Sequence, residues 1–264
     1  MSDQNRYSLI IEDIFFKHYR KDENEITFSR SEIIATAKKL KIKLPLNLGD
    51  IIYSFRYRTP LPEKIINTAS KNLEWIIRPA GRAKYKFILT KQSFITPSEH
   101  LAETKILNAT PGLIARYALG DEQGLLARVR YNRLIDIFTG LTCYSLQNHL
   151  RTTVPEMGQV ETDELYIAVD KRGVHYVIPV QAKGGNDRLS IVQILQDYAL
   201  CESKFPLLLC KPIAAQFKKN GAIVLFEFEK AEDQIKIVSE KHYRLVEPSE
   251  LSKEELEKYN TRIQ

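Results

Sequence analysis

The stretch 158-GQVETDELYIAVDKRGVHYVIPVQAKGG-185 decides the fold of this chain of 264 residues. Its two apolar runs, 165–169 and 174–180, are dense in β-branched and aromatic residues, which favour strands. The residues KRG at 171–173, between the two runs, are typical of a turn. The stretch therefore predicts a β-hairpin.

Polar side chains border both predicted strands. Glu161 and Asp163 stand before the first apolar run, and Gln181 and Lys183 end the second one. Because side chains alternate between the faces of a strand, each pair shares a face, and we expect all four side chains to converge. Mg²⁺ prefers carboxylate and carbonyl oxygens, and a nearby lysine can orient water and neutralise a phosphate. The pattern therefore predicts a site that hydrolyses phosphodiesters.

The elements around the hairpin follow a recognisable order. Apolar residues at helical spacing predict one helix over 122–138 and another over 189–200. Two further apolar runs, 205–210 and 222–228, predict strands after the second helix, and 142–154 is left to supply a strand before the hairpin. The predicted order is helix, strands, helix, strand.

This arrangement resembles the PD-(D/E)XK superfamily of restriction-endonuclease-like nucleases. Asp163 is followed eighteen positions later by Gln181-Ala182-Lys183 on a strand, and then by a helix that carries Gln193 and Gln196. The resemblance covers residues 122–228 and implies an α/β (α+β) restriction-endonuclease-like core with a mixed central sheet. The sequence departs from the family pattern at two positions: Thr162 stands where the motif has proline, and Gln181 stands where an acidic residue is usual.

The resemblance also assigns roles to residues of this chain. It implies that Asp163, the Gln181 side-chain oxygen and the Ala182 carbonyl bind Mg²⁺, and that Lys183 positions the attacking water. Glu161, on the same predicted face as Asp163, is an auxiliary carboxylate that compensates for the neutral Gln181. An acidic residue of the preceding helix can join such a site, and two are available: Glu122 and Asp136.

The first hundred residues predict helices followed by a hairpin. Apolar residues at helical spacing indicate helices over 7–19, 33–40 and 48–55. The second helix follows a capping box, Ser29-Arg30-Ser31-Glu32, whose serine and glutamate satisfy each other's free backbone N–H groups. Alternating apolar residues over 73–89, interrupted by a Pro-Ala-Gly turn, predict a two-stranded hairpin. Such an order describes a winged helix-turn-helix domain.

Positive charge is concentrated in this first part of the chain. Residues 1–100 hold 18 basic side chains against 11 acidic ones, a net charge of +7, whereas the net charge of the whole chain is +6. A basic module joined to a nearly neutral one indicates that the first part attracts a polyanion and the second carries the chemistry. We therefore expect double-stranded DNA as the partner.

Particular side chains are candidates for contacting that DNA. The third helix carries residues suited to the major groove, namely Tyr53, Arg56 and Arg58, although either arginine is equally able to pair with Asp50 or Glu63. The hairpin carries residues suited to the phosphate backbone, namely Arg82, Lys84 and Lys86. A strand-like arm carries Asn148 and Arg151. The alternatives are that the winged helix docks a protein and that the arm is an ordinary turn.

The predicted organisation is a winged helix-turn-helix domain over 1–96, a linker over 97–120 and a nuclease domain over 121–264. No window reaches the roughly 18 apolar residues of a membrane span, and the first residues lack the pattern of a signal peptide. Three cysteines without paired spacing indicate neither zinc nor a disulfide framework. The sequence thus predicts a cytoplasmic protein without membrane contact.

The expected function is a Mg²⁺-dependent DNA endonuclease, of the type II restriction kind. The resemblance alone implies a homodimer, because enzymes of this kind that cut both strands usually act as dimers. Two other functions remain open. Gln181 keeps open a non-catalytic winged-helix DNA-binding regulator that uses a degenerate nuclease fold, and the same core also serves repair or junction nucleases.

Overall fold

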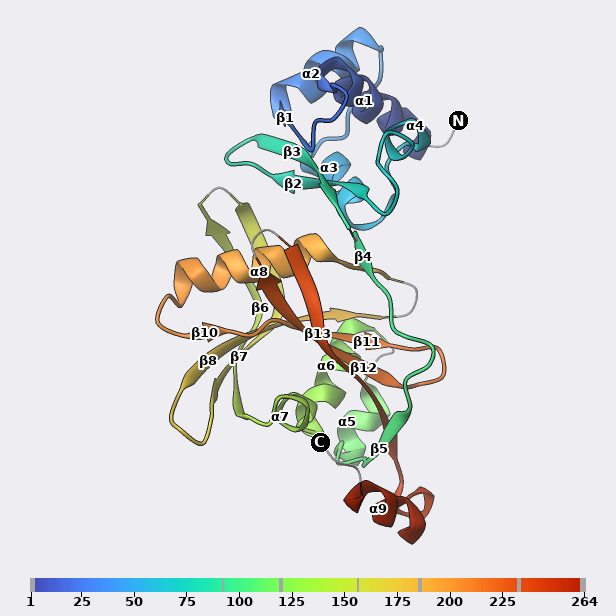
Figure 1. The fold of residues 1–264 in the computed structure, drawn as a ribbon, viewed down its shortest axis with the longest axis vertical. Helices are drawn as coiled ribbons and strands as arrows, with labels where there is room; N and C mark the ends of the chain where they lie inside the picture. Colours follow the sequence, from blue (N-terminus) through green and yellow to red (C-terminus); the bar gives the residue numbers. More distant parts are fainter. Residues whose placement is uncertain are drawn as a thin grey trace.

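Two sheets organise the chain, a mixed α/β protein whose larger sheet is itself mixed. The computed structural model describes residues 3–91, 93–118, 121–155, 157–184, 187–231 and 234–261. A three-stranded sheet belongs to the N-terminal module, from α1 to β3, and an eight-stranded sheet to the C-terminal module, from β5 to α9. Figure 1 shows the N-terminal module above the large sheet, with the strand β4 running between the two modules.

The N-terminal module contains the helices and the hairpin that the sequence predicts. Its three-stranded sheet has the antiparallel order β1-β3-β2. The strand β1 escapes prediction because it is five residues long and lies directly before a helix. The elements are α1 (Asp3–His18), β1 (Glu25–Ser29), α2 (Arg30–Lys39), α3 (Gly49–Tyr57), α4 (Glu63–Ile66), β2 (Glu74–Pro79) and β3 (Lys84–Thr90).

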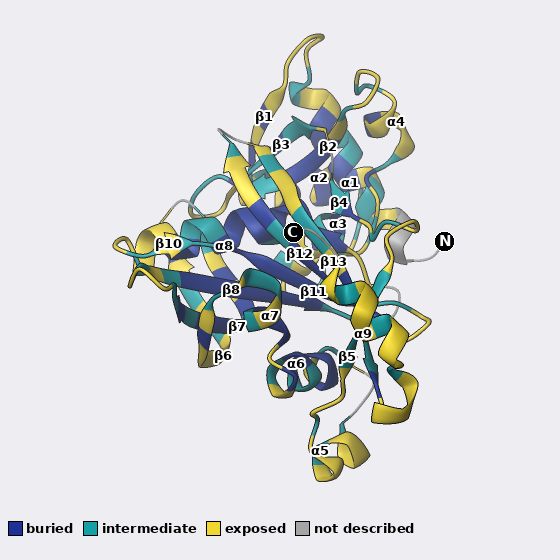
Figure 2. Cartoon of the chain, turned by 60° about the horizontal axis from the view of Figure 1, so that its bottom comes forward, coloured by how far each residue is buried: buried dark blue, intermediate teal, exposed yellow. Residues whose placement is uncertain are grey.

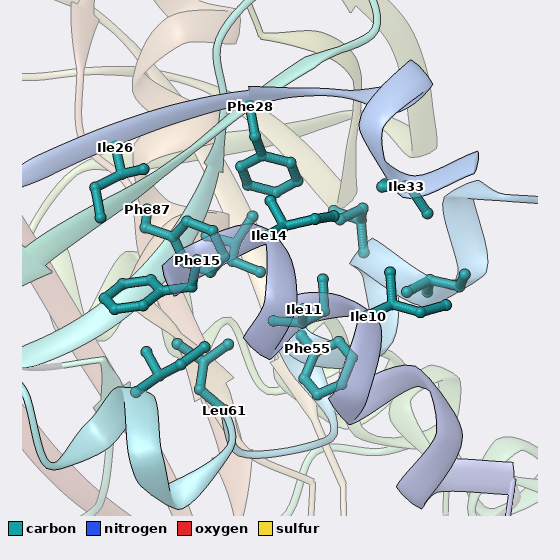
Figure 3. Close-up of a cluster of buried hydrophobic side chains, with 14 of the residues drawn as sticks. Ile10, Ile11, Ile14, Phe15, Ile26, Phe28, Ile33, Phe55, Leu61 and Phe87 are labelled. Carbon is teal, nitrogen blue, oxygen red and sulfur yellow. The ribbon is translucent and has the colours of Figure 1, made fainter. Parts of the chain in front are cut away.

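Local signals and apolar packing fix these elements. The predicted capping box is present, because the Ser29 hydroxyl accepts from the Glu32 N–H and the Glu32 carboxylate accepts from the Ser29 N–H. The core gathers apolar side chains from α1, the strands and α3, as Figure 3 shows for Phe15 and its neighbours. The Phe15 ring meets the Phe87 ring edge to face, with centroids 5.1 Å apart.

The C-terminal module is built on the sheet order β5-β13-β12-β11-β8-β7-β6, with β10 paired to β8. Neighbouring strands β6, β7 and β8 are antiparallel, whereas β8 and β11 are parallel. The elements before α8 are β5 (Glu103–Leu107), α5 (Gly112–Tyr117), α6 (Glu122–Tyr131), α7 (Leu134–Thr139), β6 (Thr142–Val154), β7 (Gly158–Val169), β8 (His175–Lys183) and β9 (Leu189–Ser190). The later ones are α8 (Ile191–Lys204), β10 (Leu209–Cys210), β11 (Ile213–Phe217), β12 (Ile223–Ala231), β13 (Gln234–Val246), a 3-10 turn (Pro248–Glu250) and α9 (Lys253–Asn260).

Helices cover both faces of the large sheet. The helix α8 lies on one face, and α6 and α7 lie on the other (Figure 1). Alternate residues of β8 point to opposite faces of the sheet, since Val177 packs with Leu200 of α8 and Ile178 packs with Leu125 of α6. The middle strands are therefore buried, whereas α5 and α9 are largely exposed (Figure 2).

Three elements of the structure differ from the prediction. The helix expected over 122–138 breaks at Arg133, which has a left-handed backbone with φ of 49°. Asn132 fixes the break, because its side chain accepts from the Ala109 N–H at 2.6 Å and donates to the Arg128 carbonyl. The run 205–210 forms only the short β10, and the strand beside β8 is the later β11. The long β13 was not predicted.

The segment 97–120, which the sequence predicts as a linker, contains regular structure. This segment contains β5, which pairs in parallel with β13 and forms one edge of the large sheet. It also contains α5. Residues 119 and 120, which end the predicted linker, lie outside the described residues. The segment is thus held by a strand far away in the sequence, a pairing that no local pattern reveals.

The two modules touch through a short strand pair and a side-chain bond. The strand β4 (Phe94–Ile95) pairs antiparallel with β9, immediately before α8. The Tyr57 hydroxyl of α3 donates to the Gln196 side-chain oxygen of α8 at 2.9 Å. Burial at this junction raises the pKa of Tyr57 to about 12. The C-terminal end of α3 therefore faces the C-terminal module.

None of the helices in the described ranges combines the length and the apolar character that crossing a bilayer requires.

Candidate active site

A side chain joins β7 to the end of β8 beyond the point where their backbone pairing stops. Backbone pairing between the two strands reaches Glu164 and Val180. One residue further, the Asp163 carboxylate accepts a hydrogen bond from the Ala182 N–H at 2.7 Å. The Thr162 hydroxyl, at the position of the motif's proline, donates to the Val180 carbonyl at 3.3 Å. Side chains thus replace the strand pairing where the predicted site lies.

Lys183 and Glu122 meet at the same place. Lys183 is the last residue of β8, and its ammonium lies 2.9 Å from Glu122 Oε1. Glu122 begins α6, whose start is fixed by the Asp121 carboxylate accepting from the Gly124 N–H. A side chain at Gly184 would come within 3.7 Å of the Asp121 and Glu122 backbone. The end of β8 and the start of α6 are therefore in contact.

The structure chooses between the two helix carboxylates that the sequence left open. Glu122 joins the cluster through Lys183. Asp136 instead lies on α7, where it pairs with Arg133 and accepts from the Cys143 N–H at 3.0 Å. We name the group of Asp163, Lys183 and Glu122 the carboxylate–lysine cluster.

Two further residues, His149 and Gln123, border this cluster. His149 of β6 has a left-handed backbone, with φ of 48°, and its ring bonds the Gln123 amide of α6 at 2.9 Å. The ring is close enough to Asp163 for a positive charge on it to lower the pKa of that carboxyl. His149 belongs to the run QNHLR at 147–151, the strand-like arm for which the sequence left open a DNA contact and an ordinary turn.

Burial dominates the electrostatics of Asp163. Desolvation raises the pKa of Asp163, and the negative charge of Glu122 raises it further. The Ala182 N–H and the Lys183 ammonium act in the opposite direction but do not cancel these effects. Burial therefore outweighs these two contacts, and the pKa of Asp163 stays above its ordinary value.

Glu161 lies at the rim rather than inside the cluster. Its side chain is 48% exposed and faces His149 and Arg151 across the strand pair, at 3.7 and 3.6 Å. Glu161 and Asp163 are two residues apart on β7, so both lie on the same side of the strand, as the sequence predicts. Salt bridges of this exposure contribute at most about 1 kcal/mol to stability. Glu161 is thus placed to contact a molecule at the surface rather than to hold a buried ion.

The prediction that Gln181 converges with the other three side chains is wrong. Gln181 is 2% exposed and its amide nitrogen donates to both carboxylate oxygens of Asp197 on α8, at 2.9 and 3.1 Å. The same nitrogen donates to the Glu161 carbonyl, and its oxygen accepts from the Gln193 amide at 3.1 Å. Strand alternation turns Gln181 toward α8, whereas Lys183, at the strand end, reaches α6. Both ends of the Gln181 amide are already bonded.

Asp197 is the functional candidate that sequence reasoning missed. It is 1% exposed, and burial raises its pKa well above the usual range, with the charge of Asp163 adding to the effect. It sits on the buried face of α8, four residues after Gln193. That spacing, which places a carboxylate and an amide on one helix face, is the signal that could have found it. Asp197 holds Gln181 and so fixes the end of β8.

The predicted DNA-binding residues of α3 divide into two groups. Tyr53 is 48% exposed, and the exposed Arg58 stacks over its ring at 5.1 Å. Arg56 instead faces the junction of the modules, where its guanidinium lies 4.9 Å from the Tyr57 ring centroid. Two of its nitrogens, Nε and Nη2, are buried and have no hydrogen-bond partner among the described residues. The prediction that Arg56 faces outward with Arg58 is wrong.

The hairpin residues also differ from one another. Arg82 and Lys84 are exposed at the turn between β2 and β3. Lys86 is less exposed and pairs with Glu25 of β1 at 2.8 Å. On the C-terminal module, Asn148 and Arg151 lie exposed along β6, and Asn148 accepts from Arg130 Nη2 at 3.2 Å. Four of these five side chains therefore keep their charge or amide donors turned to solvent.

The donor set for a cation is small. Within the described ranges, no group of three or more His, Cys, Asp and Glu side chains has a metal-binding arrangement. Mg²⁺ usually keeps several waters and needs only one or two carboxylates from a protein. Asp163, Glu122 and the Ala182 carbonyl are the oxygens that this cluster offers.

Comparisons of the chain with protein-family models, with curated proteins and with solved structures give no match.

Proposed function

We propose that this chain is a Mg²⁺-dependent DNA endonuclease of the restriction kind, with a restriction-endonuclease-like C-terminal module and a winged-helix N-terminal module. The observation that carries the proposal is the carboxylate–lysine cluster. Asp163 lies on β7 where its pairing with β8 stops, Lys183 ends β8, and Glu122 comes to them from the start of α6. Carboxylates beside one lysine at a sheet end suit the hydrolysis of a phosphodiester.

The chemistry of Asp163 supports a cation at this place. Its carboxylate has roughly four lone-pair positions and accepts a hydrogen bond from the Ala182 N–H. Burial raises its pKa, so a bound cation would stabilise its ionised form. Asp163, Glu122 and the Ala182 carbonyl would hold Mg²⁺, which when bound polarises the phosphate and lowers the pKa of its water. The neutral Gln181 is not needed as a ligand.

Lys183 supplies mobile positive charge next to the reacting phosphate. The Lys183 side chain is 15% exposed, so a substrate can reach the ammonium while most of the side chain stays packed. An ammonium at this distance from Glu122 orients the attacking water and stabilises the charge that grows on the phosphate. The N-terminus of α6 adds backbone N–H groups on the same side, which favour an anion.

Exposed charges on both modules support a DNA duplex as the substrate. The turn of the β2–β3 hairpin offers Arg82 and Lys84, α3 offers Tyr53 and Arg58, and β6 offers Arg151. Arg82 and Lys84 are placed to contact the DNA backbone, as the wing of a winged helix does. Tyr53 and Arg58 are placed to enter a groove of the duplex. Arg151 lies one strand away from the carboxylate–lysine cluster and would contact the strand being cut.

A homodimer completes the proposal for an enzyme that cuts both strands. The strand β6 ends the large sheet, and it exposes Tyr144 by 63% and Leu146 by 55%. Apolar side chains on an edge strand favour association, and a second copy would cover them.

Cleavage assays on defined DNA substrates test the proposed function. We expect supercoiled plasmid to be nicked or linearised in Mg²⁺ and to stay intact when a chelator replaces it. Equal amounts of plasmid, single-stranded DNA and a four-way junction separate a restriction-type enzyme from a repair or junction nuclease. DNA binding without cleavage of any substrate would replace this proposal by the non-catalytic regulator.

The hairpin predicts a specific change in salt dependence. We expect the double variant Arg82→Gln/Lys84→Gln to bind duplex DNA more weakly and to lower the slope of log affinity against log salt by about 1.8, for two lost phosphate contacts. Lys86→Gln is the matched control, because its ammonium already pairs with Glu25. Binding isotherms at several salt concentrations measure the slope. A slope unchanged in the double variant would mean that the hairpin does not lie on DNA.

A further inference from the structure

A cavity lies where the two modules meet, apart from the carboxylate–lysine cluster. Its volume is about 570 Å³, within the range of small-molecule sites. Its lining comes from α3 and β2 of the N-terminal module, from β4, and from the loop before β9 in the C-terminal module. Figure 1 places α3 and β4 beside α8 at this junction.

Unpartnered polar atoms distinguish this cavity. Arg56 lines it, and its Nε and Nη2 are buried without a hydrogen-bond partner in the described part of the chain. These two nitrogens form the side of the guanidinium that binds an oxyanion with two parallel hydrogen bonds. Gln216 also lines the cavity, and its Oε1 is a buried acceptor without a described donor. Its amide nitrogen is held by the Asp187 carbonyl at 3.3 Å.

Leaving such groups unpaired destabilises a fold, and native proteins keep them mainly where a ligand or water completes them. The missing partners are an anionic oxygen for Arg56 and an N–H or O–H donor for Gln216. A flat surface completes the lining, because Arg188 stacks over the Phe94 ring at 5.5 Å. Glu74 and Asp187 add carboxylate acceptors.

We propose that this cavity binds a nucleoside phosphate, with the phosphate on Arg56 and an edge of the base on Gln216. The planar base of a nucleoside phosphate matches the Phe94 ring, and its hydroxyl and amino groups match the acceptors of the lining. Its oxyanion matches Arg56. The nucleotide is either free in solution or a unit extruded from bound DNA, and both sources present the same chemistry to the cavity. The second source rests on the proposed function, whereas the first does not.

Trp75, the single tryptophan of the chain, serves as a reporter, because it borders the cavity from β2 while its ring packs against Phe15 in the N-terminal core. The experiment titrates the full-length protein with each of dAMP, dCMP, dGMP and dTMP and follows tryptophan emission. We expect a saturable change with at least one nucleotide. The matching nucleoside and inorganic phosphate, each added alone, should bind more weakly, because each fills only half of the site.

Variants tie the signal to the cavity. Arg56→Met should weaken nucleotide binding about tenfold or more, the ratio for losing a hydrogen bond to a charged group. Arg58→Met is the matched control, since Arg58 is two residues further on α3 and does not line the cavity. Gln216→Met is a second variant, in case Arg56→Met alters folding, which circular dichroism would detect.

A duplex carrying the fluorescent base analogue aminopurine tests the second source. Extrusion of the analogue into the cavity raises its emission, and this rise should disappear in Gln216→Met while DNA binding persists. A response to free nucleotides identifies the first source, and a response to the duplex alone identifies the second. The proposal is overturned if neither probe responds, or if both respond equally in the wild type, Arg56→Met and Gln216→Met. A protein that binds free nucleotides but cuts no DNA would refute only the proposed function.

Discussion

Asp163→Asn is expected to lower the rate of DNA cleavage by about a thousandfold or more, with DNA affinity nearly unchanged. The change keeps the size of the side chain and its acceptor for the Ala182 N–H but removes the negative charge. A neutral amide cannot hold a hard cation beside the phosphate as a carboxylate does. Single-turnover cleavage of a labelled plasmid measures the rate, and a filter-binding isotherm in a chelator measures the affinity.

Lys183→Met should reduce cleavage by a similar order, because the ammonium acts on the charge of the transition state. Lys171→Met is the matched control, since Lys171 lies exposed in the turn of the same hairpin. We expect the control to cleave at the wild-type rate. Full cleavage by Asp163→Asn or by Lys183→Met would remove the carboxylate–lysine cluster from the mechanism.

Gln181→Glu is expected to lower the free energy of unfolding by about 3 kcal/mol or more. The substitution would place a second carboxylate at 2.9 to 3.1 Å from Asp197, in a site where Gln181 is 2% exposed. Two buried carboxylates cannot both stay ionised at that separation, so one must be protonated at a cost in free energy. Urea denaturation followed by circular dichroism measures the change.

A second substitution isolates the cause. Asp197→Asn combined with Gln181→Glu restores one amide and one carboxylate to the pair, and we expect the double variant to recover most of the lost stability. Gln159→Glu is the control, because Gln159 is exposed on β7. If Gln181→Glu alone kept wild-type stability and tightened the response to Mg²⁺, Gln181 would belong among the metal ligands.

The site hairpin was predictable because its signals are local. The apolar runs of β7 and β8, and the turn with Gly173 at φ of 80°, are visible within one stretch of sequence. Asp163 on β7 and Lys183 at the end of β8 belong to neighbouring strands, so their proximity follows from the pairing of the hairpin. The helix start at Glu122 is also local, and only its contact with Lys183 needed the tertiary fold.

The orientation of Gln181 was not predictable, because it depends on which helix covers which face. Strand alternation groups Gln181 with Lys183, and the position of Lys183 at the strand end lets its long side chain leave that face. The partner on α8, Asp197, looks like an ordinary helix charge in the sequence. Burial of that carboxylate is a consequence of packing against β7 and β8.

Long-range pairing explains the remaining misses. The strand β5 pairs with β13 through contacts such as Lys105 with Arg244, far apart in the sequence. The strand β13 is rich in charged residues, so apolar alternation does not mark it. The inward turn of Arg56 depends on the docking of α3 against α8, which Tyr57 and Gln196 fix across the two modules.

The central claim is that the carboxylate–lysine cluster cleaves DNA with Mg²⁺. The most direct test is plasmid cleavage as a function of Mg²⁺ concentration, with wild type, Glu122→Gln and Glu161→Gln side by side. The account predicts cleavage that requires Mg²⁺ in the wild type. It also predicts a half-maximal concentration raised about fivefold or more in Glu122→Gln, for the loss of an anionic ligand, and unmoved in Glu161→Gln. Cleavage that persists in a chelator, or no cleavage by the wild type at any Mg²⁺ concentration, would contradict the account.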